Sequence, residues 1–313
     1  MLVNLNHVLI PAKQEKYAVG LFNAVNMELA RGIISAAEKT NSPVIMGTAE
    51  VLFPYGPLEE VSYYILPMAK KARVPVVVHL DHGLKKETCL KALELGFTSI
   101  MYDCSTDDYD TNVKKVKEMA EIAHSYGATI EGELGHVGDN EGSAEGSSHL
   151  TDPSKFFTDP KLAKDYVEKT KVDALAIAVG NAHGAYKLPP KLDFERIRTI
   201  ARTVDVPLVL HGGSGLTDND FRTAIKEGIS KVNIFTDINI AAVKAELSRF
   251  TDMNKGIIDL IPAAVEAVKQ ETISKMELFS SVNKATVNEN STSYDIDKIV
   301  ASVVKEVQKK LNN

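Results

Sequence analysis

The 313-residue sequence predicts an α/β fold, a (β/α)8 TIM barrel with a mobile loop after its fifth strand and an extra C-terminal helix. Two observations predict it: short β-branched apolar runs recur roughly eight times, and helical patterns lie between them. Few of the runs alternate with polar residues, which indicates strands buried on both faces, as in a parallel sheet covered by helices. A doubly wound open sheet is the alternative arrangement of such units.

The strand patterns are spaced along most of the chain. They occupy residues 18–23, 42–49, 74–81, 99–104, 128–135, 174–180, 207–213 and 231–237. The segments between them, such as MELARGIISAAEK and TDNDFRTAIKEG, repeat apolar residues at three and four positions, and several end at glycine. These are features of amphipathic helices, so strands and helices alternate as a barrel requires.

Two regions depart from this repeat. Residues 135–155, GHVGDNEGSAEGSSHLTDPSK, are rich in glycine, serine and acids, and we expect a long mobile loop there. Near the C-terminus a polar stretch, NENSTSYD, precedes the amphipathic helix IDKIVASVVKEVQKKL. This helix either packs back onto the barrel or contacts another subunit. We therefore divide the chain into a barrel, residues 1–285, and a polar linker with a C-terminal helix, residues 286–313.

Composition limits the classes of partner. The chain has 36 basic and 42 acidic residues, a formal net charge of -6, which offers nucleic acid no general attraction. Two cysteines are too few for a disulfide framework and suit a reducing compartment. The N-terminus lacks a signal-peptide pattern, and no run of about 18 apolar residues occurs. We expect a cytoplasmic protein with a small-molecule ligand, no nucleic-acid partner and no membrane contact.

Polar residues gather where the predicted strands end, and in a barrel the C-terminal ends of the strands carry the chemistry. The residues at these ends are Asp81, His82, Asp103, Glu131, Glu133, His183, His211, Ser214, Asn233 and Thr236. A single histidine at a strand end is more often structural than a ligand. Three at one mouth, His82, His183 and His211, form the donor set of a catalytic zinc site with one open position.

Two acids accompany these histidines. Asp103 and Glu133 could orient the imidazoles or offer oxygen ligands to a metal. A salt bridge in the barrel mouth is their structural alternative. The remaining histidines lack such neighbours, and we expect them to be structural or solvated; they are His7, His79, His124, His136 and His149.

The sequence HLDHG, residues 79–83, places an acid beside a histidine. Adjacent residues of a straight strand point to opposite faces, so Asp81 and His82 share one pocket only where the backbone turns. Gly83 would permit that turn. The loops HGGSG and NIFTD follow the last two strands, where barrels commonly bind phosphate through backbone N–H groups and a helix N-terminus.

Several motifs, taken together and in order, resemble the class II, zinc-dependent ketose-bisphosphate aldolases, the fructose- and tagatose-bisphosphate aldolase family. They are YAVGLFNAVN, SPVIMG, VPVVVHLDHG, MYDCS, EGELGHVG, VDALAIAVGNAHGAYK, LDFERI, VPLVLHGGSGL and KVNIFTDIN, and they cover about residues 1–282. The resemblance implies a barrel that forms a homodimer or homotetramer. It also implies reversible cleavage of a ketose phosphate into dihydroxyacetone phosphate and an aldehyde.

The resemblance also implies roles for single residues. His82, His183 and His211 would hold one Zn²⁺, and Asp81 would be the acid/base on the hydroxyl next to the broken bond. Zinc would stabilise the enediolate as a Lewis acid. In the family a second acid/base lies on the loop after strand five; Glu141 matches it, and Glu145 competes because the loop departs from the usual two glycines.

The family's substrate contacts can be carried over in the same way. Gly184, Gly212, Gly213, Ser214, Asn233 and Thr236 match the groups around the ketone-side phosphate, and Asn26 matches a substrate-contacting asparagine. The family also places a monovalent cation, Na⁺ or K⁺, nearby.

The sequence departs from the family pattern at three places. Ala49 stands where the family usually has serine or threonine, and Phe235 is larger than the usual residue. The segment LIPAAVEAVKQ lacks the arginine that relatives with two-phosphate substrates use across the dimer. Because a guanidinium recognises phosphate with two hydrogen bonds, an alternative substrate is a ketose 1-phosphate with a non-phosphorylated aldehyde partner.

Three other functions remain open from the residues alone. A Schiff-base aldolase would need a desolvated lysine at the mouth, but Lys231 begins its strand and Lys187 is the remaining candidate. A zinc hydrolase would use the same histidines to activate water, but it leaves the phosphate loops unexplained. A non-catalytic barrel subunit of a complex is the alternative from another class.

Overall fold

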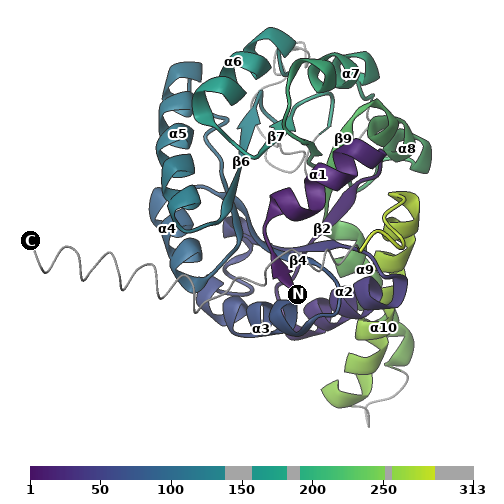
Figure 1. Cartoon of the computed structure of the whole chain (residues 1–313). Helices are drawn as coiled ribbons and strands as arrows, with labels where there is room; N and C mark the ends of the chain where they lie inside the picture. Colours follow the sequence, from purple (N-terminus) through teal and green to yellow (C-terminus); the bar gives the residue numbers. More distant parts are fainter. Residues whose placement is uncertain (138–156, 182–190, 251–255, 286–313) are drawn as a thin grey trace, which may run out of the picture.

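The structure is a computed structural model of the chain, and it describes residues 1–137, 157–181, 191–250 and 256–285. Within these residues a parallel sheet closes into a barrel, with helices on its outside (Figure 1). The strands are β1 (Leu2–Val3), β2 (Val19–Asn23), β3 (Val44–Ala49), β4 (Val76–Gly83), β5 (Ser99–Tyr102), β6 (Thr129–Leu134), β7 (Ala174–Ile177), β8 (Leu208–Leu210) and β9 (Ile229–Ile234).

Helices follow the barrel strands one by one. They are α1 (Leu5–Glu15), α2 (Met27–Thr40), the 3-10 helix η1 (Glu50–Leu52), α3 (Leu58–Lys71), α4 (Lys86–Leu95), α5 (Tyr109–Ser125), α6 (Pro160–Thr170), α7 (Phe194–Thr203), α8 (Asp218–Glu227), α9 (Thr236–Arg249) and α10 (Ile257–Leu278). None of the described helices is both long enough and apolar enough to span a bilayer.

Strand pairing confirms the predicted (β/α)8 barrel and excludes the open sheet. Strands β2 to β9 pair in chain order, all parallel, and β9 pairs back with β2. The two-residue strand β1 pairs with the first residues of β4, Leu2 opposite Val76. The eight predicted strand segments coincide with β2 to β9 to within a few residues at each end.

Alternate residues of each strand point into the barrel, as the strand period of two requires. The outward residues of β2, β3 and β4 pack under the helices, whereas Val19, Leu21, Ile45 and Val77 form an interior cluster. Helix α1 completes this cluster with Leu5, Val8, Leu9 and Ala12, all buried. The helix lies across the N-terminal mouth (Figure 1) and leaves the opposite mouth for the site.

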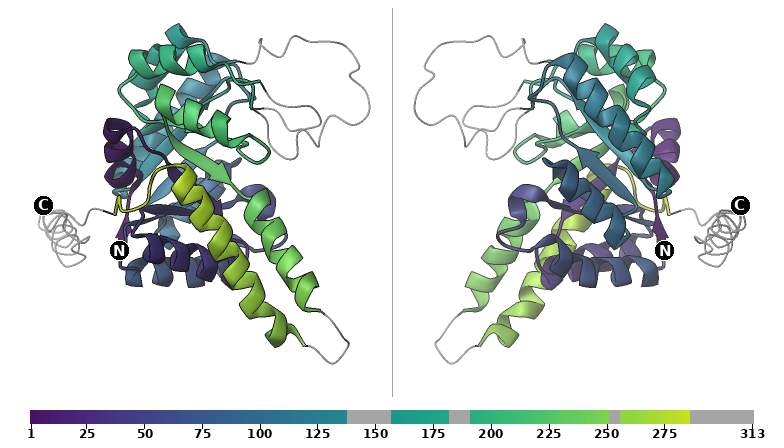
Figure 2. Two further views of the ribbon diagram at one scale, coloured as in Figure 1. Left: turned by 90° about the vertical axis from the view of Figure 1, so that its right-hand side faces the viewer. Right: turned by 90° about the vertical axis from the view of Figure 1, so that its left-hand side faces the viewer.

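Helices α9 and α10 lie side by side and extend beyond the barrel wall (Figure 2). Helix α10 packs against α2, where Gly32 allows close approach: a Cβ there would lie 2.6 Å from Val268 Cγ1. The α10 helix is the C-terminal helix of the described barrel. The predicted amphipathic helix within 286–313 and most of the predicted loop 135–155 lie outside the described residues, so the division of the chain after residue 285 stays a prediction.

Candidate active site

A pocket of about 590 Å³ opens at the C-terminal ends of the strands. Its lining brings together predicted residues from the ends of four strands, β4, β5, β8 and β9: Asp81, His82, Asp103, Gly212, Gly213, Ser214, Asn233 and Thr236. Polar groups separated by up to 155 positions thus meet in one place because parallel strands present their C-terminal ends to the same mouth.

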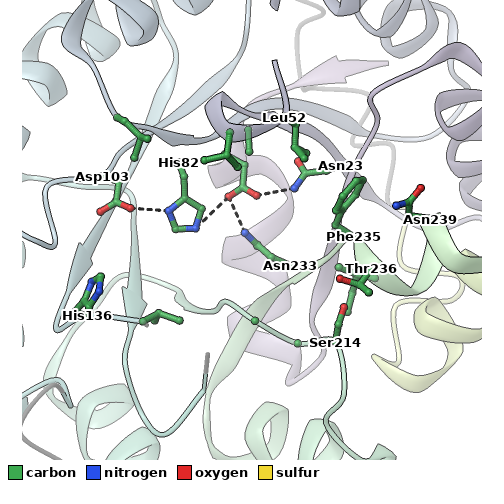
Figure 3. A pocket seen from close by; sticks show the side chains of 18 of the residues that line it. Asn23, Leu52, His82, Asp103, His136, Ser214, Asn233, Phe235, Thr236 and Asn239 are labelled. Carbon is green, nitrogen blue, oxygen red and sulfur yellow. Dashed lines mark hydrogen bonds and ion pairs between the residues drawn. The ribbon is translucent and has the colours of Figure 1, made fainter. Parts of the chain in front are cut away.

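Two asparagine side chains hold the Asp81 carboxylate in this pocket (Figure 3). Its Oδ2 accepts a hydrogen bond from Asn23 Nδ2 at 2.8 Å, and its Oδ1 accepts one from Asn233 Nδ2 at 2.8 Å. Burial would raise the pKa of Asp81, but the nearby His82, Lys231 and His211 charges outweigh it and lower the pKa to about 2. The group is therefore a fixed carboxylate, able to accept a proton.

The backbone turns at His82 to bring its ring to the same side as Asp81. His82 has φ 45°, a left-handed conformation that costs a non-glycine residue about 1 kcal/mol or more, and the β4–β5 register shifts there. The prediction that Gly83 supplies this turn is wrong. Gly83 is needed for space instead, because a Cβ there would lie 2.7 Å from Cys89 Sγ and 2.9 Å from the Met101 carbonyl oxygen.

Asp103 orients the His82 ring. His82 Nδ1 donates to Asp103 Oδ2 at 2.7 Å, and Asp103 Oδ1 accepts from the Ser105 backbone N–H at 3.0 Å. Burial opposes the charged imidazole, but the Asp103 bond and the Asp81 charge outweigh it and raise the pKa of His82. Its Nε2 lies on the other side of the ring, 3.9 Å from Asp81 Oδ1 (Figure 3).

His211 faces His82 from the end of β8. The two ring centroids are 4.6 Å apart at 65°. His211 is fully buried; its Nε2 lies 2.8 Å from Glu131 Oε1 and its Nδ1 lies 3.1 Å from Glu133 Oε2. Burial would lower the pKa of His211, but these two carboxylates outweigh it and raise the pKa to about 10.

The donor set fits a bound divalent metal. Ligand atoms of Asp81, His82 and His211 lie within 4.8 Å of one another, as do those of His82, Asp103 and Glu133. Raised histidine pKa values at the centre of buried carboxylates show that the cluster stabilises positive charge there. Imidazole nitrogens with nearby carboxylates are typical zinc donors. The third predicted ligand, His183, lies outside the described residues.

The residues predicted to bind the ketone-side phosphate line the opposite side of the pocket. Gly212 has φ 62°, and a Cβ on Gly213 would lie 3.1 Å from the Asn233 carbonyl oxygen, so the loop needs both glycines. Ser214 and Thr236 stand beside it, and Thr236 begins the 14-residue helix α9. Backbone N–H groups at a helix start favour an anion.

Other residues predicted to belong to the site lie elsewhere or outside the described part of the chain. Asn26 caps α2, its Oδ1 accepting from the Leu29 N–H at 2.9 Å, and the pocket is lined by Asn23 instead. Strand alternation carried the signal for Asn23, since it follows the inward residues Val19 and Leu21. His136, for which the sequence predicted no role in the site, also lines the pocket. The predicted Glu141, Glu145 and Gly184 lie outside the described residues.

Two other histidines of the described residues lie away from the pocket and bind other side chains of the protein. His79 is buried, its Nδ1 lies 2.7 Å from Ser99 Oγ, and burial lowers its pKa to about 3. His124 pairs at the surface with Asp173, 2.9 Å away.

Comparisons with known proteins identify the family of the chain. The sequence profile of the family "Fructose-bisphosphate aldolase class-II" matches residues 3–284. The fructose-bisphosphate aldolase of Thermus caldophilus is 39% identical, over 91% of this chain and 100% of its own. The fructose-bisphosphate aldolase of Staphylococcus aureus is 37% identical, over 91% of this chain and 99% of its own.

A solved structure agrees over the same length. The crystal structure of the YdjI aldolase from Escherichia coli K12 has a TM-score of 0.80 and 35% identity, and it covers 91% of this chain and 100% of its own. The chain therefore belongs to the class II fructose-bisphosphate aldolase family and is an enzyme of the lyase class.

Proposed function

We propose that this enzyme reversibly cleaves a ketose phosphate of the fructose- or tagatose-1,6-bisphosphate type into dihydroxyacetone phosphate and an aldehyde. One observation carries the proposal: the Asp81 carboxylate lies between two asparagine amides, beside a histidine cluster that fits a metal. A glycine-rich anion loop lies on the other side of the same pocket. Retro-aldol chemistry needs these three parts together.

One Zn²⁺ would be held by His82 and His211, with His183 as the third imidazole and Asp103 and Glu133 as supporting or alternative donors. When bound, it supplies a Lewis acid that spreads the charge of an enediolate. The orientation of the rings is already set by this chain's own carboxylates, because Asp103 holds His82 and Glu131 holds His211.

Asp81 would take the proton from the substrate hydroxyl next to the breaking bond. It is ionised, and both of its oxygens are held in place by amide donors. The Oδ1 atoms of Asn23 and Asn233 are buried without a hydrogen-bond partner in the described part of the chain. Buried acceptors of this kind are costly when unsatisfied, so we assign them to substrate hydroxyls.

The ketone-side phosphate would lie on Gly212, Gly213, Ser214 and the start of α9, with Gly184 completing the loop set. The second proton transfer is assigned to Glu141, with Glu145 as its competitor. A Na⁺ or K⁺ ion beside this phosphate, a homodimer or homotetramer, and a cytoplasmic location complete the proposal.

A second candidate substrate is a ketose 1-phosphate with a non-phosphorylated aldehyde half. The pocket wall beside Asp81 is apolar: it includes Ala49, Val51, Leu52, Leu84 and Phe235. Among the described residues that line the pocket there is neither lysine nor arginine. An apolar wall gives a second phosphate no counter-charge, so this observation favours an uncharged aldehyde.

The test is aldol condensation of dihydroxyacetone phosphate with a panel of phosphorylated and plain aldehydes, before and after treatment with a chelator. We expect condensation that the chelator abolishes and Zn²⁺ restores. The apolar wall further predicts that plain aldehydes compete well with glyceraldehyde 3-phosphate, a result that would favour the ketose 1-phosphate over the bisphosphate. A strong preference for the phosphorylated aldehyde would instead support a bisphosphate substrate. Bound metal without turnover of any adduct would favour a hydrolase or a non-catalytic subunit.

The Schiff-base alternative has a separate test. Lys231 is fully buried and paired with Glu131 at 2.8 Å, and it does not line the pocket, so it is not a nucleophile for substrate. Lys187 lies outside the described residues. We expect borohydride to trap no covalent adduct in the presence of substrate; a trapped adduct would contradict the metal mechanism.

A further inference from the structure

A second polar layer lies inside the barrel, directly beneath the pocket. Lys231, Glu131 and His79 each stand two residues before Asn233, Glu133 and Asp81 on β9, β6 and β4, so they point inward one layer deeper. All three are completely buried. Beneath them lies the apolar cluster of Val19, Leu21 and Val77.

An ion pair occupies this layer. Lys231 Nζ lies 2.8 Å from Glu131 Oε2, and both side chains are 0% exposed. Burying two charges costs several kcal/mol of desolvation per ion, and apolar replacements of buried pairs are often neutral or stabilising. Fold stability alone is therefore a weak reason for this pair, and its position under the histidine cluster points to another role.

The pair is connected to the site through a single histidine. Glu131 uses Oε2 for Lys231 and Oε1 for His211, whose Nε2 lies 2.8 Å away. Because an ionised carboxylate only accepts, Nε2 carries the hydrogen of this bond. The other nitrogen, Nδ1, is turned toward Glu133 Oε2, 3.1 Å away, on the side where His82 lies.

We propose that Lys231 and Glu131 are positioning residues that act through His211: Lys231 fixes Glu131, and Glu131 fixes the ring so that Nδ1 is the nitrogen offered to the metal. His82 is held the opposite way, with Nδ1 on Asp103 and Nε2 toward the cluster. The two imidazoles thus present different nitrogens, each chosen by a carboxylate. The inference rests on the proposed metal site but assigns a role to two residues that do not line the pocket.

The test compares metal binding in variants that keep the layer filled. The double variant Lys231→Met with Glu131→Gln removes both charges at similar volume, so no buried charge is left without its partner. We expect a folded protein whose Zn²⁺ affinity, measured by competition with a chromophoric chelator, is about 10- to 100-fold weaker. The visible d–d bands of its Co²⁺-substituted form should also change.

A second variant and a control separate positioning from general damage. Glu131→Asp keeps both charges but withdraws the carboxylate by one methylene, so it should also weaken Zn²⁺ binding. This variant provides the test if the double variant does not fold. Thr170→Val removes a buried bond to the Tyr166 carbonyl oxygen, 2.7 Å long, at the end of α6 and away from the residues that line the pocket. This control should lower the melting temperature and leave both Zn²⁺ affinity and the Co²⁺ spectrum unchanged.

The outcomes distinguish this proposal from the proposed function. Wild-type affinity and an unchanged Co²⁺ spectrum in the folded double variant, or in Glu131→Asp, would overturn the positioning role alone. A wild-type protein that binds Zn²⁺ but condenses no aldehyde would contradict the aldolase assignment and leave the positioning role supported if the variants bind more weakly. A wild-type protein that binds no divalent metal would overturn both.

Discussion

At the residue scale Asp81 and His211 have different proposed roles, proton transfer and metal binding, and substitutions should separate them. Asp81→Asn preserves the size of the side chain but removes the proton acceptor, so we expect kcat for cleavage to fall by about 100- to 10,000-fold. Zinc content should stay near wild type. His211→Ala should lose both zinc and cleavage, because it removes a ring of the cluster. Metal analysis and steady-state kinetics check this, and normal turnover of Asp81→Asn would show that another group moves the proton.

Two asparagines three positions apart should behave differently. Asn23 donates to Asp81, and a hydrogen bond to a charged group contributes about 1.5–3 kcal/mol, so Asn23→Ala should lower kcat/KM by about tenfold or more. Asn26→Ala removes a helix cap and should cost about 1 kcal/mol of unfolding free energy with kcat/KM unchanged. Steady-state kinetics and urea denaturation of the two variants check this. A lower kcat/KM in Asn26→Ala but not in Asn23→Ala would assign the substrate contact to Asn26.

The sequence predicted which residues line the pocket where two features determine it: the alternation of inward and outward residues along a strand, and position at the strand's C-terminal end. Asp81, Gly213, Asn233 and Thr236 all line one pocket, as the barrel mouth requires. The left-handed backbone at His82 could not be predicted, because nothing in HLDHG distinguishes a turn at the histidine from one at the glycine. The Lys231–Glu131 pair escaped notice because contacts across a barrel join positions 100 residues apart in sequence.

At the scale of elements, helix α1 closes one mouth of the barrel with a single apolar face. Leu9 is fully buried in the interior cluster, whereas its neighbour Ile10 is 45% exposed. Leu9→Ala should therefore lower the unfolding free energy by about 2–5 kcal/mol, and Ile10→Ala by well under half of that. Urea denaturation measures both. Equal losses would mean that α1 does not act as a plug.

The sequence predicted the strands well because continuous apolar runs identify buried parallel strands. The 42–49 segment, for example, became Val44–Ala49, and 74–81 became Val76–Gly83. Helix α1 was not predicted, since LNHVLIPAKQE contains a proline and a modest apolar face. Its helical state depends on burial inside the barrel mouth, which is a tertiary effect.

For the whole molecule, metal binding and folding should be linked. A ligand that binds only the folded chain stabilises it by about 4 kcal/mol at 1,000 times its dissociation constant, so Zn²⁺ should raise the melting temperature of the metal-free protein by roughly 10 °C. Scanning calorimetry measures the shift. His211→Ala should show none, and Mg²⁺ should shift the wild type little, because imidazole donors prefer zinc. Equal stabilisation by both ions would argue against an imidazole site.

The order of the motifs in the sequence was enough to predict the closed barrel and the family. It was not enough to predict the substrate or the oligomeric state. The residues to which we assign the choice of aldehyde come from η1, the end of β4 and the start of α9, and they meet only when the barrel closes. The LIPAAVEAVKQ segment lies in α10, which extends beyond the barrel wall, where sequence alone identifies no neighbour (Figure 2).

The apolar wall of the pocket also has an evolutionary meaning. Val51 and Leu84, 63% and 50% exposed, stand on short connecting segments, and Glu50 ties these together by accepting the Leu84 N–H at 2.8 Å. The proposed proton-transfer group, Asp81, and the His211 imidazole, by contrast, are held by buried partners on the barrel strands. Descendants of this enzyme can therefore diversify their aldehyde through exposed positions, one substitution at a time, while the inherited reaction is preserved.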